Sequence, residues 1–425
     1  MNLRVLFFFP HNLFLSRTGA HQRGLEMLTA LTELGCDVTL FSSVVSSDAP
    51  WSGFSSGPLT NRPCRNLILH APAPLEAAWM WAGRKAYRTL KMLSNVVSAG
   101  FEARLIGTSG LSTRSMRLQF RKAVANIQPD VIFMSYGWWD GLLDHAGEGH
   151  RLRIVDTIDL ISVATHMRSA LQAAIGTGIV TPASLPAETL REEFFDDLRD
   201  PGAALAAECA VYDKYDVSIA ISRSEGKVLE DKARKTRVVT IPMTRTPVAV
   251  RNTYEGAALF AAGLNPFNVH GYAYFVSRVL PSVRALAPQF RLEVTGTVCQ
   301  RLAPTDNVLL SGMVDRLEQV YADAPFLVNP VYGGTGQQVK IVDAMAHGVP
   351  VVALDRAALG SPMRHGENGL IAKNAEEFSS HVATLWRDRD LCRRLGANAR
   401  ATIANECAPA MLRDALERIL HTRTA

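Results

Sequence analysis

Apolar residues are arranged along this chain in two alternating patterns. One pattern consists of short continuous runs of Val, Ile, Leu and Phe, which are typical of strands buried on both faces of a parallel sheet. In the other, apolar residues recur every three or four positions, as Leu25, Leu28 and Leu31 do after Gly19. Runs and helically spaced stretches follow one another from end to end, and this alternation predicts an α/β protein.

The apolar runs fall into two series separated by a predicted linker at 245–256. In order, strands are predicted at 2–9, 37–42, 130–135, 153–159, 217–221, 238–242, 257–263, 290–295, 308–311, 326–329 and 349–354. We therefore predict two Rossmann-like domains, at 1–244 and 257–407. A closing helix at 408–425 is predicted to return to the first domain.

Length and composition agree with this division. A chain of 425 residues is too long for one ordinary core, and 48% hydrophobic against 20% charged residues describes a well-packed globular protein. The six cysteines form no CxxC pair and no cluster with histidine, so no zinc or redox site is predicted. Reduced thiols, and hence a cytoplasmic location, are the expectation.

The N-terminal apolar run resembles a signal peptide only superficially. Pro10 breaks the run early, and no small-residue cleavage site follows it. We predict a first strand there. No apolar stretch reaches the roughly 18 residues that a spanning helix needs, so none is predicted.

The net charge of +5 is concentrated in one segment, 72–122. Nine Lys or Arg residues lie between Arg84 and Lys122, against a single acid, Glu102. Residues 72–100 are amphipathic, with aromatic residues near the basic ones. Two interpretations remain open, a peripheral contact with an anionic membrane surface and an ordinary solvated helix. Nucleic-acid binding is the weaker choice, because no nucleic-acid-binding motif accompanies the charge. The aromatic and basic residues are Trp79, Trp81, Tyr87, Arg84, Lys85, Arg88 and Lys91.

The stretch 326–354 contains the most specific chemistry, because it combines a strand, a glycine-rich turn, a helix and a strand. The turn 333–336 leaves backbone amides unshielded at the positive end of a helix, where phosphate binds. Lys340 adds a cation one turn later, and Asp343 lies on the same face, where it can accept ribose hydroxyls. The turn is neither a Walker loop nor a dinucleotide fingerprint. The alternative to a phosphate-binding role is that the glycines only form a tight structural turn.

The wider stretch GTGQQVKIVDAMAHGVPVV, followed by HGENGLIAKNAEEF, resembles glycosyltransferase family 4, also called glycosyl transferases group 1. The resemblance continues through SGMVDRLEQVYADAPFLVNP, and more loosely over nearly the whole chain. It implies the GT-B architecture, with two Rossmann-like domains facing a central cleft. It also implies sugar transfer from a nucleotide diphosphate sugar, with retention and without a metal or other cofactor.

The resemblance also implies a set of donor-binding residues, although the chain departs from the family at several of them. The family often carries two glutamates where Thr335 and Asp343 stand, and one glycine of its N-terminal loop is Ala20 here. The arginine and lysine that often clamp the diphosphate are missing from 261–271. The implied set is Gly19, Ala20, Arg23, Met313, Val314, Gly334, Thr335, Gly336, Gln337, Gln338, Lys340 and Asp343.

Polar residues after the strand at 153–159 are the catalytic candidates. Asp156, Asp159 and His166 lie where α/β sheets place ligand groups, and a carboxylate or imidazole there can hold or deprotonate an acceptor hydroxyl. The alternative is that either aspartate caps the following helix. The next segment, 169–207, is predicted to hold a mobile acceptor-side loop and an acidic helix near 192–200.

The function predicted from these features is transfer of a sugar to a glycan, lipid-linked or surface-polysaccharide acceptor. The departures at Thr335 and at the missing arginine–lysine clamp keep a second class open, a non-catalytic nucleotide-sugar-binding protein. A protein or small-molecule acceptor is a further alternative. An epimerase of the same architecture would need additional histidines and acids that the chain does not show.

Overall fold

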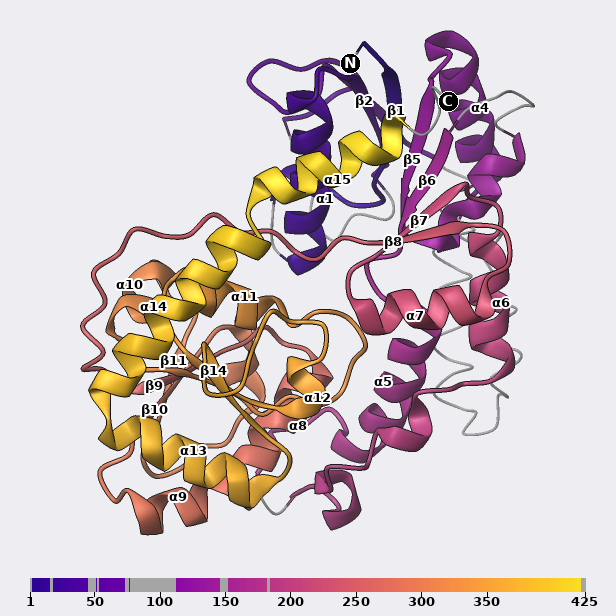
Figure 1. Ribbon diagram of the computed structural model, residues 1–425. Helices are drawn as coiled ribbons and strands as arrows, with labels where there is room; N and C mark the ends of the chain where they lie inside the picture. The colour runs from indigo at the N-terminus through magenta and orange to yellow at the C-terminus, as the bar shows by residue number, and fades with distance from the viewer. Residues whose placement is uncertain are drawn as a thin grey trace. The chain divides into compact units, whose positions relative to one another are not determined.

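The computed structural model describes residues 2–15, 18–44, 51, 53–72, 76, 112–145, 152–181 and 184–421. The chain forms two compact units, each with its own sheet (Figure 1). The first comprises Met1–Ser162, Pro201–Ile241 and Leu412–Ala425. The second comprises Val163–Asp200 and Pro242–Met411.

The sheet of the first unit has eight strands in the order β3-β4-β2-β1-β5-β6-β7-β8, and every pair except β3–β4 is parallel. Strand β1 is central, with Val5 paired to Val38 on one side and Val131 on the other. The strands are β1 (Arg4–Phe8), β2 (Asp37–Ser43), β3 (Gly57–Pro58), β4 (Asn66–His70), β5 (Val131–Ser135), β6 (Leu152–Asp156), β7 (Val217–Ala220) and β8 (Arg237–Thr240).

Helices cover this sheet and close its core. The rings of Phe7 and Phe133 stack at 4.8 Å inside it, and Leu412 and Leu416 of the last helix pack into the same core. Figure 1 shows that last helix, α15, alongside α1. The helices are η1 (Leu13–Leu15), α1 (Gly19–Glu33), α4 (Arg114–Ile127), η3 (Gly137–His145), α6 (Ala203–Tyr212), α7 (Arg223–Lys232) and α15 (Pro409–His421). Helix α5 (Ile161–Ile175) begins in the first unit and continues into the second.

The sheet of the second unit has six parallel strands in the order β11-β10-β9-β12-β13-β14. Strands β9, β12 and β13 are buried throughout, as their apolar runs predict. The strands are β9 (Ala258–Ala261), β10 (Leu292–Thr295), β11 (Val308–Gly312), β12 (Leu327–Asn329), β13 (Val351–Leu354) and β14 (Gly369–Ala372).

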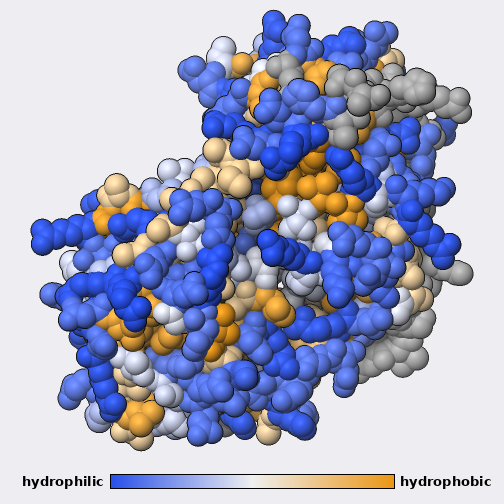
Figure 2. Space-filling model, in the orientation of Figure 1, coloured by the Kyte–Doolittle hydropathy of each residue, from blue (hydrophilic) through white to orange (hydrophobic). Residues whose placement is uncertain are grey.

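The helices of the second unit connect these strands in sequence. They are η5 (Ala187–Leu190), η6 (Asp196–Leu198), α8 (Pro266–Tyr274), η7 (Phe275–Val279), α9 (Leu280–Leu286), η8 (Thr297–Arg301), α10 (Leu317–Asp323), α11 (Val339–Ala346), α12 (Asp355–Ala358), α13 (Ala375–Arg387) and α14 (Arg389–Glu406). Hydrophilic residues cover most of the visible surface of either unit (Figure 2). Among the described residues, no helix combines the length and apolar character needed to cross a bilayer.

These observations confirm the α/β fold with two Rossmann-like sheets. The division of the chain differs from the predicted one at 163–200, which groups with the second unit although it precedes the last strands of the first. The predicted acidic helix near 192–200 is wrong, since the only helical element in that range is the short turn η6, and η5 precedes it. Long-range contacts of that segment, described below, replace regular helical hydrogen bonds. The predicted amphipathic stretch 72–100 lies almost entirely outside the described residues.

Candidate functional site

The turn at 333–336 follows β12 and leads into α11. Gly334 has φ of 102°, a conformation that side-chain-bearing residues rarely adopt. A β carbon on Gly333 would come within 2.5 Å of the Phe267 ring and 2.7 Å of the Phe195 ring. The geometry therefore requires glycine at Gly333 and Gly334.

The start of α11 has no side-chain cap. Its N-cap residue, Gln338, has extended backbone angles and makes no capping hydrogen bond with its side chain. Helix N-termini without such caps carry unpaired N–H groups and a positive dipole, which together favour an anion.

Gln337, which was predicted to touch the donor, is buried with its amide engaged by backbone. Its Oε1 accepts from the Met243 N–H at 2.7 Å, and its Nε2 donates to the Gly360 carbonyl at 2.9 Å. The side chain therefore links the turn to two other loops of the second unit. This arrangement gives Gln337 a role in holding the turn.

Lys340 is the second residue of α11 and has an unusual environment. Its Nζ donates to Oδ1 of Asn268 at 2.5 Å and lies 5.0 Å from the centre of the Phe260 ring. Burial of the ammonium lowers its pKa to about 7, and no charged group contributes to that shift. An anion bound beside Lys340 would stabilise the ammonium form.

Asp343, the proposed ribose contact, carries an ion pair. Arg245 donates from Nε to its Oδ1 at 2.5 Å, and both side chains are mostly buried. Thr335 stands half-buried in the turn itself.

Met313 and Val314 follow β11, on the far side of the same sheet. Met313 is 72% exposed, and Gly312 before it has φ of 68°. Because β10 and β9 separate β11 from β12, the two loops start roughly 14 Å apart across the sheet. The proposed base and phosphate contacts therefore belong to separate loops on the second unit.

The donor residues predicted in the first unit lie at the start of α1. Thr18 caps this helix by accepting from the His21 N–H, and Gly19 and Ala20 form its first turn. Arg23 is buried and forms a bidentate ion pair, with Nε 2.8 Å and NH2 2.8 Å from the two Asp156 oxygens. Its guanidinium is neutralised within the first unit.

The catalytic candidates have different surroundings. Asp156 is fully buried against Arg23, whereas Asp159 is half-buried in the loop after β6. His166 is half-buried on α5, in the part of that helix that belongs to the second unit. Their catalytic roles stay predictions, and the pairing of Asp156 gives that carboxylate a structural role as well.

Sequence reasoning missed Asn268 and Arg245, the partners of Lys340 and Asp343. A local signal existed for Asn268, because Asn265-Pro266 is a helix start, and the Asn265 side chain indeed accepts from the Phe267 N–H at 3.0 Å. That helix start places Asn268 in the first turn of α8, in the loop region where the family often carries its clamp. Arg245 lies in the predicted linker and had no such signal.

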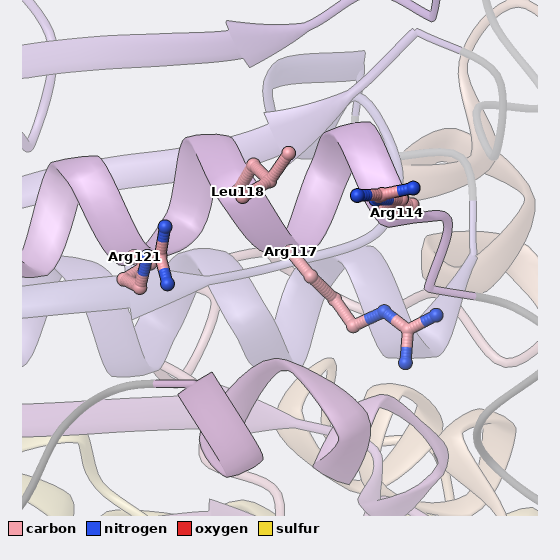
Figure 3. A pocket seen from close by; sticks show the side chains of 4 residues that line it. All are labelled: Arg114, Arg117, Leu118 and Arg121. Atoms are coloured by element: carbon pink, nitrogen blue, oxygen red, sulfur yellow. The ribbon is translucent and has the colours of Figure 1, made fainter.

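A second surface feature is a basic helix face on α4. Arg114, Arg117 and Arg121 extend from successive turns around a shallow pocket of about 230 Å³, with Leu118 between them (Figure 3). Leu118 is 42% exposed. This face is the described part of the basic segment 72–122.

Comparison with known proteins bears on the second unit. Residues 255–388 match the family described as Glycosyl transferases group 1, and this match confirms the predicted resemblance over that part of the chain. An uncharacterised 44.6 kDa protein from the cps region of Klebsiella pneumoniae is 23% identical over 146 residues, 32% of this chain and 38% of that protein. D-inositol 3-phosphate glycosyltransferase of Nocardia farcinica is 36% identical over 92 residues, 21% of this chain and 20% of that protein. Both matches span well under half of the relatives' own length.

Solved structures share the fold over the whole chain. Sucrose-phosphate synthase from Thermosynechococcus elongatus has a TM-score of 0.63 at 14% identity, covering 99% of both chains. Anabaena HepE in complex with UDP and glucose has a TM-score of 0.61 at 12% identity, covering 99% of this chain and 100% of its own. The lipopolysaccharide outer core galactosyltransferase WaaB has a TM-score of 0.54 at 10% identity, covering 99% and 100%. These similarities establish the fold.

Proposed function

We propose that this protein is a glycosyltransferase that takes its sugar from a nucleotide diphosphate sugar bound at the turn 333–336. The observation that carries the proposal is Lys340, a half-buried lysine with a desolvated ammonium group beside a glycine turn and an uncapped helix start, within the segment that matches the glycosyltransferase family. Backbone amides, the helix dipole and an ammonium group together suit a diphosphate. The UDP in the HepE complex supports a nucleoside diphosphate as the donor group.

The acceptor is a glycan, a lipid-linked sugar or a surface-polysaccharide intermediate. The cps-region protein and the lipopolysaccharide galactosyltransferase support this class, since both names refer to bacterial surface or capsule chemistry. A protein or small-molecule acceptor is the alternative. Transfer proceeds with retention of the anomeric configuration and without a metal ion or other cofactor, as the family resemblance implies.

The protein reaches its acceptor at an anionic membrane surface through the basic segment 72–122. The arginines of α4 support this part of the proposal, because each basic residue near such a surface contributes about 1 kcal/mol before screening by salt. Leu118, exposed among them, suits shallow insertion. The test is sedimentation with anionic liposomes at low salt. Replacement of Arg114, Arg117 and Arg121 by Glu should reduce it, and a wild type that stays in the supernatant contradicts membrane binding.

A second candidate is a nucleotide-sugar-binding protein without turnover. The pairing of Asp156 with Arg23 favours it, since both carboxylate oxygens of this catalytic candidate accept hydrogen bonds from the buried guanidinium. Both candidates require the same donor site.

One experiment separates them. Purified protein is incubated with UDP-, GDP- and ADP-sugars in the presence of EDTA, and both binding and release of nucleoside diphosphate are followed. A glycosyltransferase releases the diphosphate slowly alone and faster with acceptor, and NMR of the product gives its anomeric configuration. Binding without release supports the second candidate. The absence of binding to every donor contradicts both.

A further inference from the structure

The segment 187–198, called the strap below, lies along the edge of the second sheet where ligands of open α/β sheets bind. Its residues contact the segments that follow three adjacent strands, at Tyr332 after β12, Arg356 after β13 and Ala375 after β14. Crevices outside the carboxyl ends of parallel strands are the usual ligand sites of such sheets. The strap therefore belongs to the surroundings of the proposed donor site.

Hydrogen bonds fix the first half of the strap through one carbonyl. His270 Nε2 donates to the Thr189 carbonyl at 2.6 Å, and the Tyr332 hydroxyl donates to the same oxygen at 3.2 Å. Because a carbonyl only accepts, Nε2 of His270 carries its proton. Both donors are buried, and Tyr332 immediately precedes Gly333.

Acidic side chains fix the second half. Glu192 Oε1 accepts from the Tyr274 hydroxyl at 2.6 Å and from the Ala375 N–H at 3.1 Å. Arg356 donates to both oxygens of Asp196, at 3.0 and 2.7 Å. The strap is thus anchored on both sides of residue 195.

Phe195 lies between these anchors and is fully buried. Its ring is 5.8 Å from Phe267, 5.3 Å from His270 and 5.5 Å from Tyr332, centre to centre. It also approaches Gly333 so closely that a β carbon there would lie 2.7 Å from it. The backbone of the turn therefore rests directly on the Phe195 and Phe267 rings.

We propose that Phe195 is a positioning residue for the donor turn, which the strap supplies from a part of the chain far from the glycosyltransferase segment. The ring supports the backbone at Gly333 and so keeps the following amides in the arrangement that binds a diphosphate. This inference rests on the proposed function, because the proposed function assigns diphosphate binding to the same turn. It also explains why 163–200 groups with the second unit.

The test compares Phe195→Ala with Phe194→Ala. Phe194 lies next along the strap and contacts the rings of Phe195 and His270, but the atoms nearest to a β carbon on Gly333 belong to Phe267 and Phe195, so Phe194 is a matched control. Binding of UDP and GDP is measured by calorimetry, and hydrogen exchange of the amides at 334–336 is measured without nucleotide. We expect Phe195→Ala to weaken binding at least about tenfold and to accelerate exchange, with changes below about twofold in Phe194→Ala.

The two measurements distinguish the possible failures. If the wild type binds neither nucleotide, the donor proposal is in error, and hydrogen exchange alone decides the role of Phe195. If Phe195→Ala exchanges and binds as the wild type does, the strap does not position the turn. Phe195→Leu, which keeps an apolar side chain, guards against a variant that fails to fold, and it should show intermediate exchange and binding. A lowered melting temperature with unchanged exchange at 334–336 would mean a purely structural role and would overturn the inference.

Discussion

Each unit places a charged side chain near the carboxyl edge of its sheet, and the two side chains have different partners. In the first unit Asp156, the last residue of β6, forms a two-pronged ion pair with Arg23. In the second unit Lys340 has a neutral amide, Asn268, and an aromatic ring as its neighbours. The charge of Asp156 is neutralised by an ion pair, whereas Lys340 forms no ion pair with any described residue.

The difference separates a structural pair from a ligand site. A buried ion pair whose hydrogen bonds are complete has little to gain from a ligand, and removal of one partner leaves the other charge unpaired. Desolvation disfavours the charged form of a lysine that has no counter-ion among the described residues, and the lowered pKa of Lys340 has this cause. An anionic ligand supplies the missing counter-charge. The second unit is therefore the better place to look for an anion.

The largest effect is expected from breaking the balanced pair. Asp156→Asn should lower the free energy of unfolding by about 3–5 kcal/mol, because Arg23 is then buried without a counter-charge. Urea unfolding followed by tryptophan fluorescence measures this, since Trp138 and Trp139 belong to the first unit.

The control for this change is the double variant Arg23→Met with Asp156→Leu, which removes both charges and should recover part of the loss. A stable Asp156→Asn protein that has lost transferase activity would instead support the catalytic assignment. That result would weaken the comparison between the two units.

The sequence predicted the second unit well where the relevant contacts are local. The stretch β12, turn, α11 and β13 follows from apolar spacing and glycines within thirty or so neighbouring residues, and its helix and strands form where expected. Thr18, which caps α1, also has a local signal.

The partners of the charged side chains could not be predicted from local sequence. Arg23 and Asp156 are 133 positions apart, and Lys340 and Asn268 are 72 apart, so only the fold brings them together. The strap shows the same limit. Its acidic composition suggested a helix near 192–200, but burial of Phe195 and the bonds of Glu192 and Asp196 to other elements favour short turns instead. In this segment long-range packing outweighs the local helix propensity.

The next effect concerns the unbalanced charge itself. Lys340→Met keeps the length and apolar stem of the side chain but removes the ammonium, so donor affinity should fall by about 1.5–3 kcal/mol. Stability should stay the same or rise, because a desolvated ammonium is removed. Calorimetry with UDP or GDP and a thermal melt test the two parts. A large loss of stability with unchanged nucleotide affinity would mean that Lys340, like Arg23, has a structural role.

A smaller effect is expected from the turn 333–336, which precedes Lys340 in the chain. Gly333→Ala places a methyl group against the rings of Phe267 and Phe195, and overpacking of this kind costs roughly 1–3 kcal/mol. Part of that cost should appear as weaker nucleotide binding, because the backbone of the turn must shift. Gly178→Ala is the control, since its β carbon would meet no neighbour within 4 Å. Equal behaviour of the two variants in a binding assay would show that the turn tolerates displacement.

The smallest effect, and the most direct test of the comparison, is the pH dependence of binding. In the empty protein the pKa of Lys340 is about 7, below its usual value, so the lysine is mostly neutral at pH 8. A bound diphosphate raises that pKa, and binding at pH 8 must therefore take up a proton. Affinity should fall as pH rises above about 7, by at most about tenfold per pH unit.

Free lysine in the unfolded chain keeps its proton up to about pH 10, so the same group makes the empty protein more stable as pH rises from about 7 to about 10. Calorimetric titrations of the protein with nucleoside diphosphate at pH 8, in two buffers with different ionisation enthalpies, count the protons taken up on binding. The phosphate groups do not contribute to this count, because their second pKa of about 6 leaves them already ionised at pH 8. Lys340→Met should show no uptake. An equal proton count in both proteins would mean that Lys340 does not meet the diphosphate, and the charge left unbalanced in the second unit would then have no role in binding the donor.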